Sequence, residues 1–267
     1  MKIQLNGEAR TVAAGDYASL RDAIGSDANA LIVGGHARPW QTPTRDGDEA
    51  IFLDATSAPD ARTWRAIYDA RYGRAIMEQL QAGRVAVCGL GGLGSLVAIE
   101  LGRLGVGELL LVDFDAVEPT NLARQQYQLR HLGMTKTAAM AEILAECAPL
   151  TRVTTHTLRL APDNIAATLA DWPIVCEALD RPDAKAMLTA ELLALDPRPT
   201  MVGASGMAGY GSGNAIGVKE ALPGFYLAGD GSSEGEEGIG LMAPRVGLCA
   251  SAQATMIMRL LLGETTP

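Results

Sequence analysis

The stretch RVAVCGLGGLGSLVAIELGRLGVGELLLVDFD, residues 84–115, decides the fold. It reads as a strand, a glycine-rich loop, a helix and a second strand, and the continuous apolar run in 108–115 is typical of a strand buried on both faces. The alternation continues with a helix at 136–149 and strands at 152–160 and 173–179. This order predicts an α/β fold, namely a Rossmann-like, mostly parallel sheet with helices on both faces.

The glycines of this stretch predict a nucleotide site. Gly89, Gly91 and Gly94 match G-x-G-x-x-G between a strand and a helix. Glycine permits the tight turn and lets the backbone approach a phosphate, and the helix N-terminus favours negative charge. Asp113, at the end of the next strand, is placed to hold a ribose hydroxyl. An NAD(H)-binding Rossmann oxidoreductase has the same features, so it is the first alternative.

The segment DFDAVEPTNLARQQY, residues 113–127, holds more polar groups than a dinucleotide requires. An arginine and a lysine that converge on one site suit a polyphosphate, and they can stabilise charge on an α-phosphate and a leaving pyrophosphate. The polar groups beyond Asp113 are Asp115, Asn121, Arg124, Gln125 and, at the start of the next helix, Lys136.

One further acid follows a later strand. Asp180 comes just after the strand at 173–179, so it is expected at the carboxyl edge of the sheet, where open α/β sheets bind ligands. Mg²⁺ commonly takes one or two carboxylates together with phosphate oxygens. The polar residues together therefore favour ATP, Mg²⁺ and attack at phosphorus over hydride transfer.

The composition of the chain bears on whether it binds nucleic acid, a membrane or zinc. The 267 residues carry a formal net charge of −9, which disfavours nucleic-acid binding. No run of about 18 apolar residues occurs and no signal peptide precedes the first strand, so a cytoplasmic protein with no membrane contact is expected. The cysteines, Cys88, Cys147, Cys176 and Cys249, form no C-x-x-C pair, so no zinc is expected. Each lies among apolar residues and is expected to act as a small hydrophobe.

Three domains are expected along the chain. Residues 1–55 read as strand, strand, helix, strand and strand, with a hairpin turn at Asn6-Gly7. Residues 56–82 read as a linker and one helix, and residues 83–267 form the nucleotide-binding domain. The predicted helix has Trp64, Tyr68, Tyr72, Ile76 and Leu80 at steps of four.

Six motifs occur in an order that resembles the ThiF/MoeB superfamily of ubiquitin-like-protein activating enzymes. They are RYGR (71–74), GLGGLGS (89–95), LVDFDAVEPTNLARQ (111–125), GMTK (133–136), CEALD (176–180) and GLMAPRVGLCASAQA (240–254). The chain is most similar to ThiF-type enzymes of thiamine biosynthesis that adenylate the sulfur carrier ThiS and carry an N-terminal ubiquitin-like segment.

The resemblance implies a reaction and a set of roles. ATP would adenylate the C-terminal Gly-Gly carboxylate of a small ThiS-like carrier protein and release pyrophosphate, with thiamine (thiazole) synthesis as the pathway and molybdopterin or another sulfur-transfer route as the alternative. The implied ATP-binding residues are Gly89, Gly91, Gly92, Asp113, Asp115, Asn121, Arg124, Gln125 and Lys136. Arg124 and Lys136 would also stabilise developing charge, and Asp180 would bind Mg²⁺. Arg74 would reach the partner subunit's site as an arginine finger, which requires a homodimer.

The chain departs from this family in two places. It lacks the paired C-x-x-C motifs that hold zinc in many relatives, and the segment 224–240, which matches a crossover loop, has no Cys. The reaction is therefore expected to stop at adenylation. That loop is expected to close over a carrier tail or to be disordered.

The first domain, residues 1–55, resembles a β-grasp fold such as ThiS itself. It cannot be a carrier within this chain, because Leu53 continues into Asp54 and the pair Gly34-Gly35 is internal. A structural or docking role is expected instead. A non-catalytic scaffold that binds a carrier is the remaining alternative for the whole chain.

Overall fold

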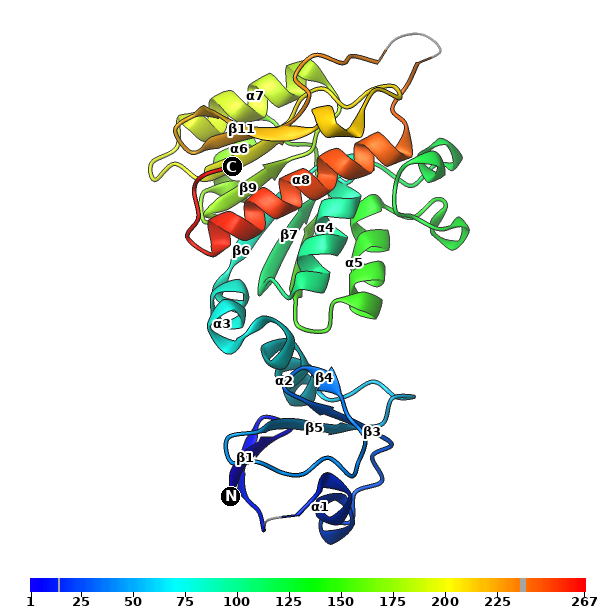
Figure 1. Ribbon diagram of the computed structural model, residues 1–267. Coiled ribbons are helices and arrows are strands. Elements are labelled where there is room, and N and C mark those ends of the chain that lie inside the picture. The colour runs from blue at the N-terminus through cyan, green and yellow to red at the C-terminus, as the bar shows by residue number, and fades with distance from the viewer. Residues whose placement is uncertain (14, 236–238) are drawn as a thin grey trace. The chain divides into compact units, whose positions relative to one another are not determined.

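The structure is a computed structural model that describes residues 1–13, 15–235 and 239–267 (Figure 1). The chain forms two compact units, Met1–Glu78 and Gln79–Pro267. The predicted three-part division at residues 55 and 82 stays a prediction. In the structure, the segment that follows residue 55 is packed as part of the first unit.

The first unit contains a five-stranded sheet in the order β2-β1-β5-β3-β4. The elements are β1 (Lys2–Leu5), β2 (Glu8–Thr11), α1 (Tyr17–Ala23), β3 (Ala30–Val33), β4 (His36–Ala37) and β5 (Glu49–Leu53). The hairpin at Asn6-Gly7 is confirmed, since Leu5 pairs with Glu8 and both turn residues have positive φ. The predicted order of elements is confirmed as well. Sequence reasoning missed β4, because two residues are too short to show an alternating pattern.

The small sheet is covered on both faces. Ala50 and Phe52 of β5 face α1 and join the apolar cluster there. Ile51, which points the opposite way, is buried beside Ala66 and Ala70 of α2 (Ala61–Tyr72). The alternation of side chains along a strand therefore divides β5 between two layers.

The prediction of one helix across residues 64–80 is wrong. The structure has two helices, α2 and α3 (Arg74–Ala82), with Gly73 between them. Gly73 has φ +91°, which only glycine adopts without strain, and this conformation ends α2. The apolar spacing of four continues across the break, so the periodicity concealed it.

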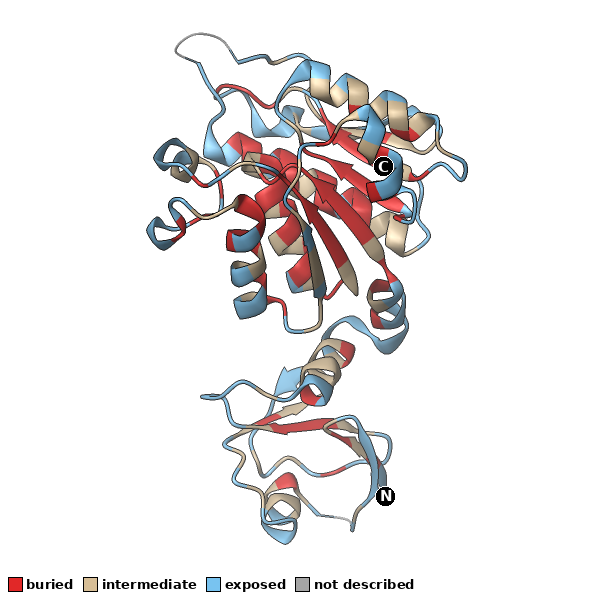
Figure 2. Ribbon diagram, turned by 180° about the vertical axis from the view of Figure 1, so that it is seen from behind, coloured by how far each residue is buried: buried red, intermediate tan, exposed pale blue. Residues whose placement is uncertain are grey.

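The second unit has a seven-stranded sheet in the order β11-β12-β10-β9-β6-β7-β8, parallel except for β11. The strands are β6 (Arg84–Cys88), β7 (Glu108–Val112), β8 (Arg152–His156), β9 (Ile174–Glu177), β10 (Thr200–Ala204), β11 (Gly217–Leu222) and β12 (Phe225–Gly229). The central strands β6, β7, β9 and β10 are almost entirely buried, and Figure 2 shows buried strands between helices. The edge strands β8 and β11 are half-buried or exposed. The predicted Rossmann-like α/β fold is confirmed.

Helices cover both faces of this sheet. On one face lie α4 (Gly92–Leu104), α5 (Lys136–Cys147) and α8 (Ala243–Leu261), and on the other lie α6 (Pro162–Leu169) and α7 (Pro182–Leu193). Short 3₁₀ helices are η1 (Pro119–Ala123), η2 (Leu129–His131) and η3 (Gly213–Ala215). Along β6, Val85 and Val87 enter the first layer while Ala86 and Cys88 enter the second. No helix among the described residues combines the length and the apolar character that crossing a bilayer requires.

The segment 224–240 is not a continuous loop as predicted. Residues 225–229 form β12, which pairs in parallel with β10. Gly224 before the strand and Gly229 as its last residue made this short strand look like part of a loop. Only the residues after β12 connect to α8, and the part of the prediction that concerns 236–238 lies outside the described residues.

The strand order creates a crevice. β6 lies between β7, which follows it through α4, and β9, which comes later in the chain. The connections therefore run in opposite directions from β6, and such a switch point leaves a ligand crevice at the carboxyl ends of the two strands. The glycine loop leaves β6 at this point.

The packing of Gly94 generates a stability prediction. A Cβ on Gly94 would lie 1.8 Å from the Gly89 carbonyl oxygen, whereas a Cβ on Gly247 of α8 would meet nothing closer than Leu96 at 3.7 Å. We expect Gly94→Ala to lower the free energy of unfolding by about 1–3 kcal/mol or more, because the backbone must shift. Gly247→Ala, the control, should be neutral or stabilising, because alanine favours a helix interior. Urea unfolding monitored by circular dichroism measures both, and equal stabilities would contradict the packing described here.

Candidate active site

The glycine loop allows two strand ends to meet. Gly89 has φ +92°, and a Cβ there would lie 2.6 Å from the Ala178 carbonyl oxygen. A Cβ on Gly92 would lie 2.9 Å from Val246 and 3.4 Å from Arg124. Gly91, the N-cap of α4, supplies no side-chain cap, so N–H groups of the first turn are available to an anion.

Asp113 fastens the end of β7 to this loop. Its carboxylate accepts hydrogen bonds from the Leu90 backbone N–H at 2.6 Å and the Asp115 backbone N–H at 2.8 Å. Burial raises the pKa of this carboxyl, although both hydrogen bonds and the nearby Lys136 oppose the shift. Because each carboxylate oxygen can accept a second hydrogen bond, a contact to a ribose stays possible and stays a prediction.

Lys136 and Asp115 form an ion pair that sequence reasoning did not anticipate. Lys136 Nζ lies 2.8 Å from Asp115 Oδ2, and the Lys136 backbone N–H donates to the Asp115 carbonyl at 2.9 Å. Lys136 is only 7% exposed. Asp115 therefore fixes the first residue of α5 and its ammonium group, and the ATP contact that the sequence suggested for Asp115 stays a prediction.

Arg124 and Gln125 carry polar atoms that the folded chain leaves unused. Arg124 lies against Gly92, and Gln125 Nε2 is 4.0 Å from a Cβ built on Gly91. Arg124 Nε and Gln125 Oε1 are both buried and have no hydrogen-bond partner among the described residues. Buried polar groups are rarely left without a partner. Two such atoms beside a glycine loop point to a polar ligand.

Asn121 shapes the turn that carries this pair. Its side-chain Oδ1 accepts from the Glu118 backbone N–H at 3.0 Å, and its carbonyl accepts from the N–H groups of Arg124 and Gln125. The structure therefore gives Asn121 a positioning function at the start of η1, and its predicted phosphate contact stays a prediction.

Asp180 lies on the loop after β9, as expected, and its side chain is exposed. Among the residues that the structure describes, its carboxylate makes no hydrogen bond or ion pair. Glu177, at the end of the same strand, is instead buried and paired with Lys185. Sequence reasoning missed this pair, although a glutamate ending a continuous apolar strand was a usable signal.

The acidic groups fit a metal that is bound mainly by phosphates. Within 1–13, 15–235 and 239–267, no cluster of three or more His, Cys, Asp or Glu side chains could hold a metal ion. A Mg²⁺ ion carried by a nucleotide needs only one or two carboxylates from the protein. The exposed carboxylate of Asp180 at the carboxyl edge of the sheet meets that requirement.

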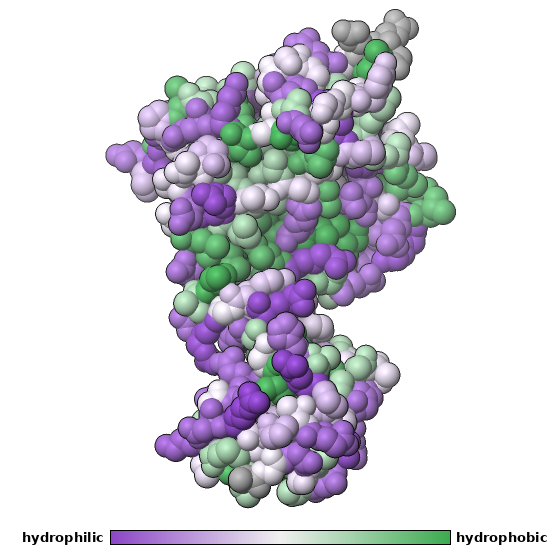
Figure 3. Space-filling model, viewed as in Figure 1, coloured by the Kyte–Doolittle hydropathy of each residue, from purple (hydrophilic) through white to green (hydrophobic). Residues whose placement is uncertain are grey.

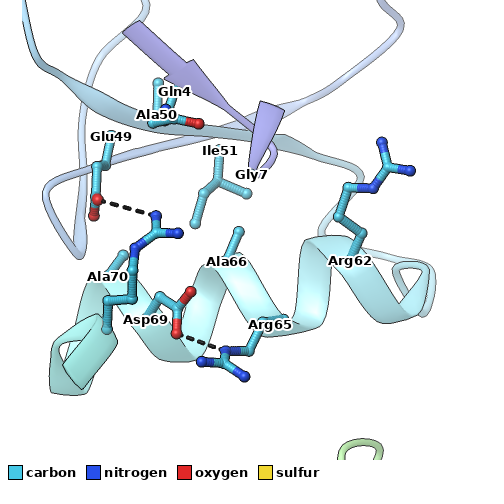
Figure 4. A pocket seen from close by; sticks show the side chains of 11 residues that line it. Gln4, Gly7, Glu49, Ala50, Ile51, Arg62, Arg65, Ala66, Asp69 and Ala70 are labelled. Atoms are coloured by element: carbon cyan, nitrogen blue, oxygen red, sulfur yellow. Dashed lines mark hydrogen bonds and ion pairs between the residues drawn. The ribbon is translucent and has the colours of Figure 1, made fainter. Parts of the chain in front are cut away.

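Arg74 lies in the first unit, at the start of α3. Arg74 Nη2 lies 3.6 Å from Glu49 Oε1 of β5, and Figure 4 shows Glu49 on the strand side of the pocket. The two side chains border a cavity of about 130 Å³ between the small sheet and α2, together with the ion pair of Arg65 and Asp69. The role of Arg74 as an arginine finger stays a prediction.

A second hollow, of about 460 Å³, lies in the second unit beside the start of α8. Arg245 is buried there, pairs with Asp230 and donates to the Ser212 carbonyl. Backbone N–H groups of Ser232 and Ser233 and the arginine hold the pKa of Asp230 well below its usual range. Val246, the next residue, borders Gly92. The start of α8 therefore contacts both the hollow and the glycine loop.

Three of the four thiols of this unit are poor nucleophiles. Cys88, Cys176 and Cys249 are buried, and Cys147 is half-buried. Burial raises the pKa of all three buried thiols, that of Cys249 to about 12. Since the thiolate is the reactive form, none of the three is suited to covalent catalysis near neutral pH.

The sequence model of the ThiF family matches residues 65–267. The chain therefore belongs to the ThiF family. The adenylyltransferase and sulfurtransferase UBA4 of Candida glabrata is 29% identical over 210 residues, which are 72% of this chain and 48% of that protein. The tRNA threonylcarbamoyladenosine dehydratase of Escherichia coli is 36% identical over 121 residues, or 45% of each chain. This chain thus spans about half the length of these curated relatives.

Solved structures share the fold. The E. coli tRNA threonylcarbamoyladenosine dehydratase in complex with ATP superposes with a TM-score of 0.68 at 23% identity, covering 78% of this chain and 97% of that one. The same dehydratase with AMP also has a TM-score of 0.68, at 22% identity and with coverage of 77% and 97%. These likenesses confirm the Rossmann-like fold of the second unit.

The burial of the thiols generates a labelling prediction. We expect the native protein at pH 8 to react with iodoacetamide at Cys147 at least tenfold faster than at Cys249, because a thiol with a raised pKa is almost entirely protonated there. Mass spectrometry of peptides after timed quenching measures the rates, and labelling in denaturant is the control. Equal native rates at the two sites would contradict the burial of Cys249.

Proposed function

We propose that this ThiF-family protein adenylates the C-terminal Gly-Gly carboxylate of a small ThiS-like sulfur carrier protein, with release of pyrophosphate, in the thiazole branch of thiamine synthesis. The observation that carries the proposal is the pair of unpartnered buried atoms, Arg124 Nε and Gln125 Oε1, beside the glycine loop. Relatives named as adenylyltransferases, and an ATP complex of a protein with the same fold, support it.

The chemistry is a displacement at phosphorus. A carboxylate oxygen of the carrier attacks the α-phosphorus, and the bond between that phosphorus and the bridging oxygen of the β-phosphate breaks. Backbone N–H groups of the glycine loop approach the phosphates, and Asp113 holds the ribose. Arg124 stabilises the charge that builds up on the α-phosphate and on the leaving pyrophosphate.

Lys136 can join Arg124 without leaving Asp115. An ammonium group has three donors, and the ion pair at 2.8 Å uses one of them. Asp115 therefore orients Lys136, and a remaining donor contacts a phosphate oxygen. We call Arg124 and Lys136 together the charge clamp. It is preorganised, because the Lys136 ammonium group is already held in place by Asp115 before the nucleotide binds.

Asp180 is the proposed protein ligand to Mg²⁺, which would neutralise phosphate charge when bound. The carboxylate is exposed, and no hydrogen bond or ion pair holds it among the described residues, so it can turn toward a bound nucleotide. No zinc is part of the proposal.

The hollow beside α8 is proposed as the entry for the carrier tail. Arg245 lines it and Val246 borders Gly92, so a tail in the hollow would lie close to the glycine loop. A Gly-Gly end is slender enough to pass where side chains crowd the path. Because the buried thiols have raised pKa values and the crossover segment has no Cys, the reaction is proposed to stop at the adenylate.

The first unit is proposed to be a β-grasp domain with a docking or structural role. Its sheet order, with β1 and β5 adjacent and parallel in the centre, supports that fold. A homodimer is proposed because Arg74 would act in the partner's site. Exposed apolar side chains near α8, including Leu248 and Met242, give self-association a surface, and Figure 3 shows hydrophobic residues on that side of the second unit.

A second candidate function is ATP-dependent dehydration of a modified tRNA nucleoside. It is suggested by the E. coli relative, which is named a tRNA threonylcarbamoyladenosine dehydratase. Both activities would place ATP at the same glycine loop. The net charge of −9 favours a protein carrier over tRNA, because RNA binding relies on basic surfaces.

Titration calorimetry with MgATP and with NADH separates both of these candidates from an NAD(H)-binding oxidoreductase. Tight binding of NADH without binding of ATP would refute adenylation.

The first functional prediction concerns the charge clamp. We expect Arg124→Ala and Lys136→Ala each to lower ATP–pyrophosphate exchange about 10²–10³-fold, the usual loss on removing one preorganised donor. Arg130→Ala is the matched control, because Arg130 is an exposed arginine on η2 that pairs with Glu142 and Glu146. When exchange is measured with a ThiS-like carrier, Arg130→Ala should have a rate near that of the wild type. Wild-type rates in Arg124→Ala and Lys136→Ala would disprove the role of these two residues in stabilising phosphate charge.

The second functional prediction concerns action across subunits. Arg74→Ala and Asp180→Ala proteins should each be nearly inactive alone, whereas a mixture should recover up to about a quarter of the exchange activity, because a mixed dimer contains one intact site. Arg71→Ala is the control for the loss of an arginine: Arg71 is exposed and has no role in the proposal, so this variant should be active alone. Mass spectrometry verifies that the two inactive proteins have exchanged subunits. If the mixture is still inactive after this exchange, action of Arg74 in the partner's site is ruled out.

A further inference from the structure

A buried ion pair stands at the root of the loop that carries Asp180. Glu177, the last residue of β9, is 2% exposed. Lys185, in the first turn of α7, places Nζ 2.8 Å from both carboxylate oxygens and donates to the Ala204 carbonyl at 3.2 Å. The pair therefore joins β9, α7 and the end of β10.

Further contacts fix Glu177 at both its side chain and its backbone. Glu177 Oε1 accepts from the Leu179 backbone N–H at 2.7 Å, which turns the chain directly after the strand. Gln253 of α8 donates to the Glu177 carbonyl at 3.0 Å and to the Val202 carbonyl at 3.2 Å. A Cβ on Gly203 would lie 3.1 Å from Glu177 Oε2, so the absence of a side chain there leaves room for the carboxylate.

The fold alone does not require charge at this place. Removing two ions from water is costly, and apolar residues of similar volume often stabilise a protein as well as a buried ion pair does. The hydrogen bond to Leu179 is different, since an apolar residue could not make it. What the charged pair adds is a defined direction for the chain from Glu177 onward.

That direction leads to the proposed metal ligand. The Ala178 backbone N–H donates to the Cys88 carbonyl at 2.9 Å, and the Ala178 carbonyl lies against Gly89. The loop is thus held in register with the glycine loop, and two residues later it presents the exposed Asp180. We propose that Glu177 and Lys185 are positioning residues that aim the Asp180 carboxylate at the Mg²⁺ ion of the bound nucleotide. The inference rests on the metal role of Asp180 in the proposed function.

The test measures how much Mg²⁺ strengthens ATP binding. Calorimetric titration with ATP in Mg²⁺ and in EDTA gives the ratio of the two dissociation constants. We take the ratio as the dissociation constant in EDTA divided by that in Mg²⁺. We expect Glu177→Met/Lys185→Met to reduce this ratio about 10–100-fold, the usual loss when a group supporting a metal ligand is removed. Binding in EDTA and the melting temperature should change little, since two apolar side chains replace the ion pair together. A merely structural pair would leave the ratio unchanged.

The matched control is Arg84→Met/Glu108→Met. This pair, at 2.8 Å, joins the amino ends of β6 and β7 in the same unit, at the opposite edge of the sheet from the crevice. It should leave the ratio at the wild-type value. If the first double variant does not fold, Gly203→Ala serves as the second variant. Its methyl group would lie 3.1 Å from Glu177 Oε2 and displace the carboxylate, so this variant must also lower the ratio.

Asp180→Asn separates the two hypotheses. If this variant loses the Mg²⁺ effect and the Glu177/Lys185 variant loses it as well, the inference holds. If Asp180→Asn loses the effect but the double variant and Gly203→Ala keep it, the inference is overturned and the proposed function stands. If Asp180→Asn keeps the effect, the metal role assigned in the proposed function is itself wrong, and the inference ends with it.

Discussion

The candidate site depends on one close contact, the approach of the Gly89 backbone to the Ala178 carbonyl. It brings the ends of β6 and β9 together at the switch point of the sheet, where any side chain on residue 89 would collide. The Gly94 contact with Gly89 then sets where α4 begins. Two polar groups of the site are positioned relative to this junction. Asp113 ties β7 to it, and Arg124 packs against it through Gly92.

Much of this was predictable because the signals are local. The glycine loop, the apolar strand before Asp113 and the polar run to Gln125 lie within 40 residues, and regular spacing along the chain determines what they form. The fold of the second unit and the place of Asp180 followed from the same alternation. The polar residues themselves favoured ATP and Mg²⁺, the family resemblance supplied the individual roles, and these contacts stay predictions.

The features that escaped prediction depend on contacts distant in sequence or on backbone angles. Asp115 meets Lys136 across 21 residues, and Lys185 of α7 meets Glu177 at the end of β9. A glutamate at the end of an apolar strand indicates a buried charge, but no pattern of residue types shows which opposite charge will meet it. The break at Gly73 is a change of backbone angle inside an unbroken apolar spacing of four, so no residue pattern marks it. In β12, the glycines at its end and just before it are typical of a loop, so the strand did not stand out.

The covering of the small sheet has a consequence for how the first unit can make contacts. With α1 packed on one face and α2 on the other, the strands β1–β5, all of them within the described residues, carry no large apolar side chain that is exposed. The unpaired backbone groups lie at the perimeter, along β2 on one side and β4 on the other, and every residue of β2 is exposed. A protein that binds this unit through its sheet would have to add a strand to β2 or β4. Main-chain hydrogen bonds would then supply most of the affinity, and side chains would supply the specificity.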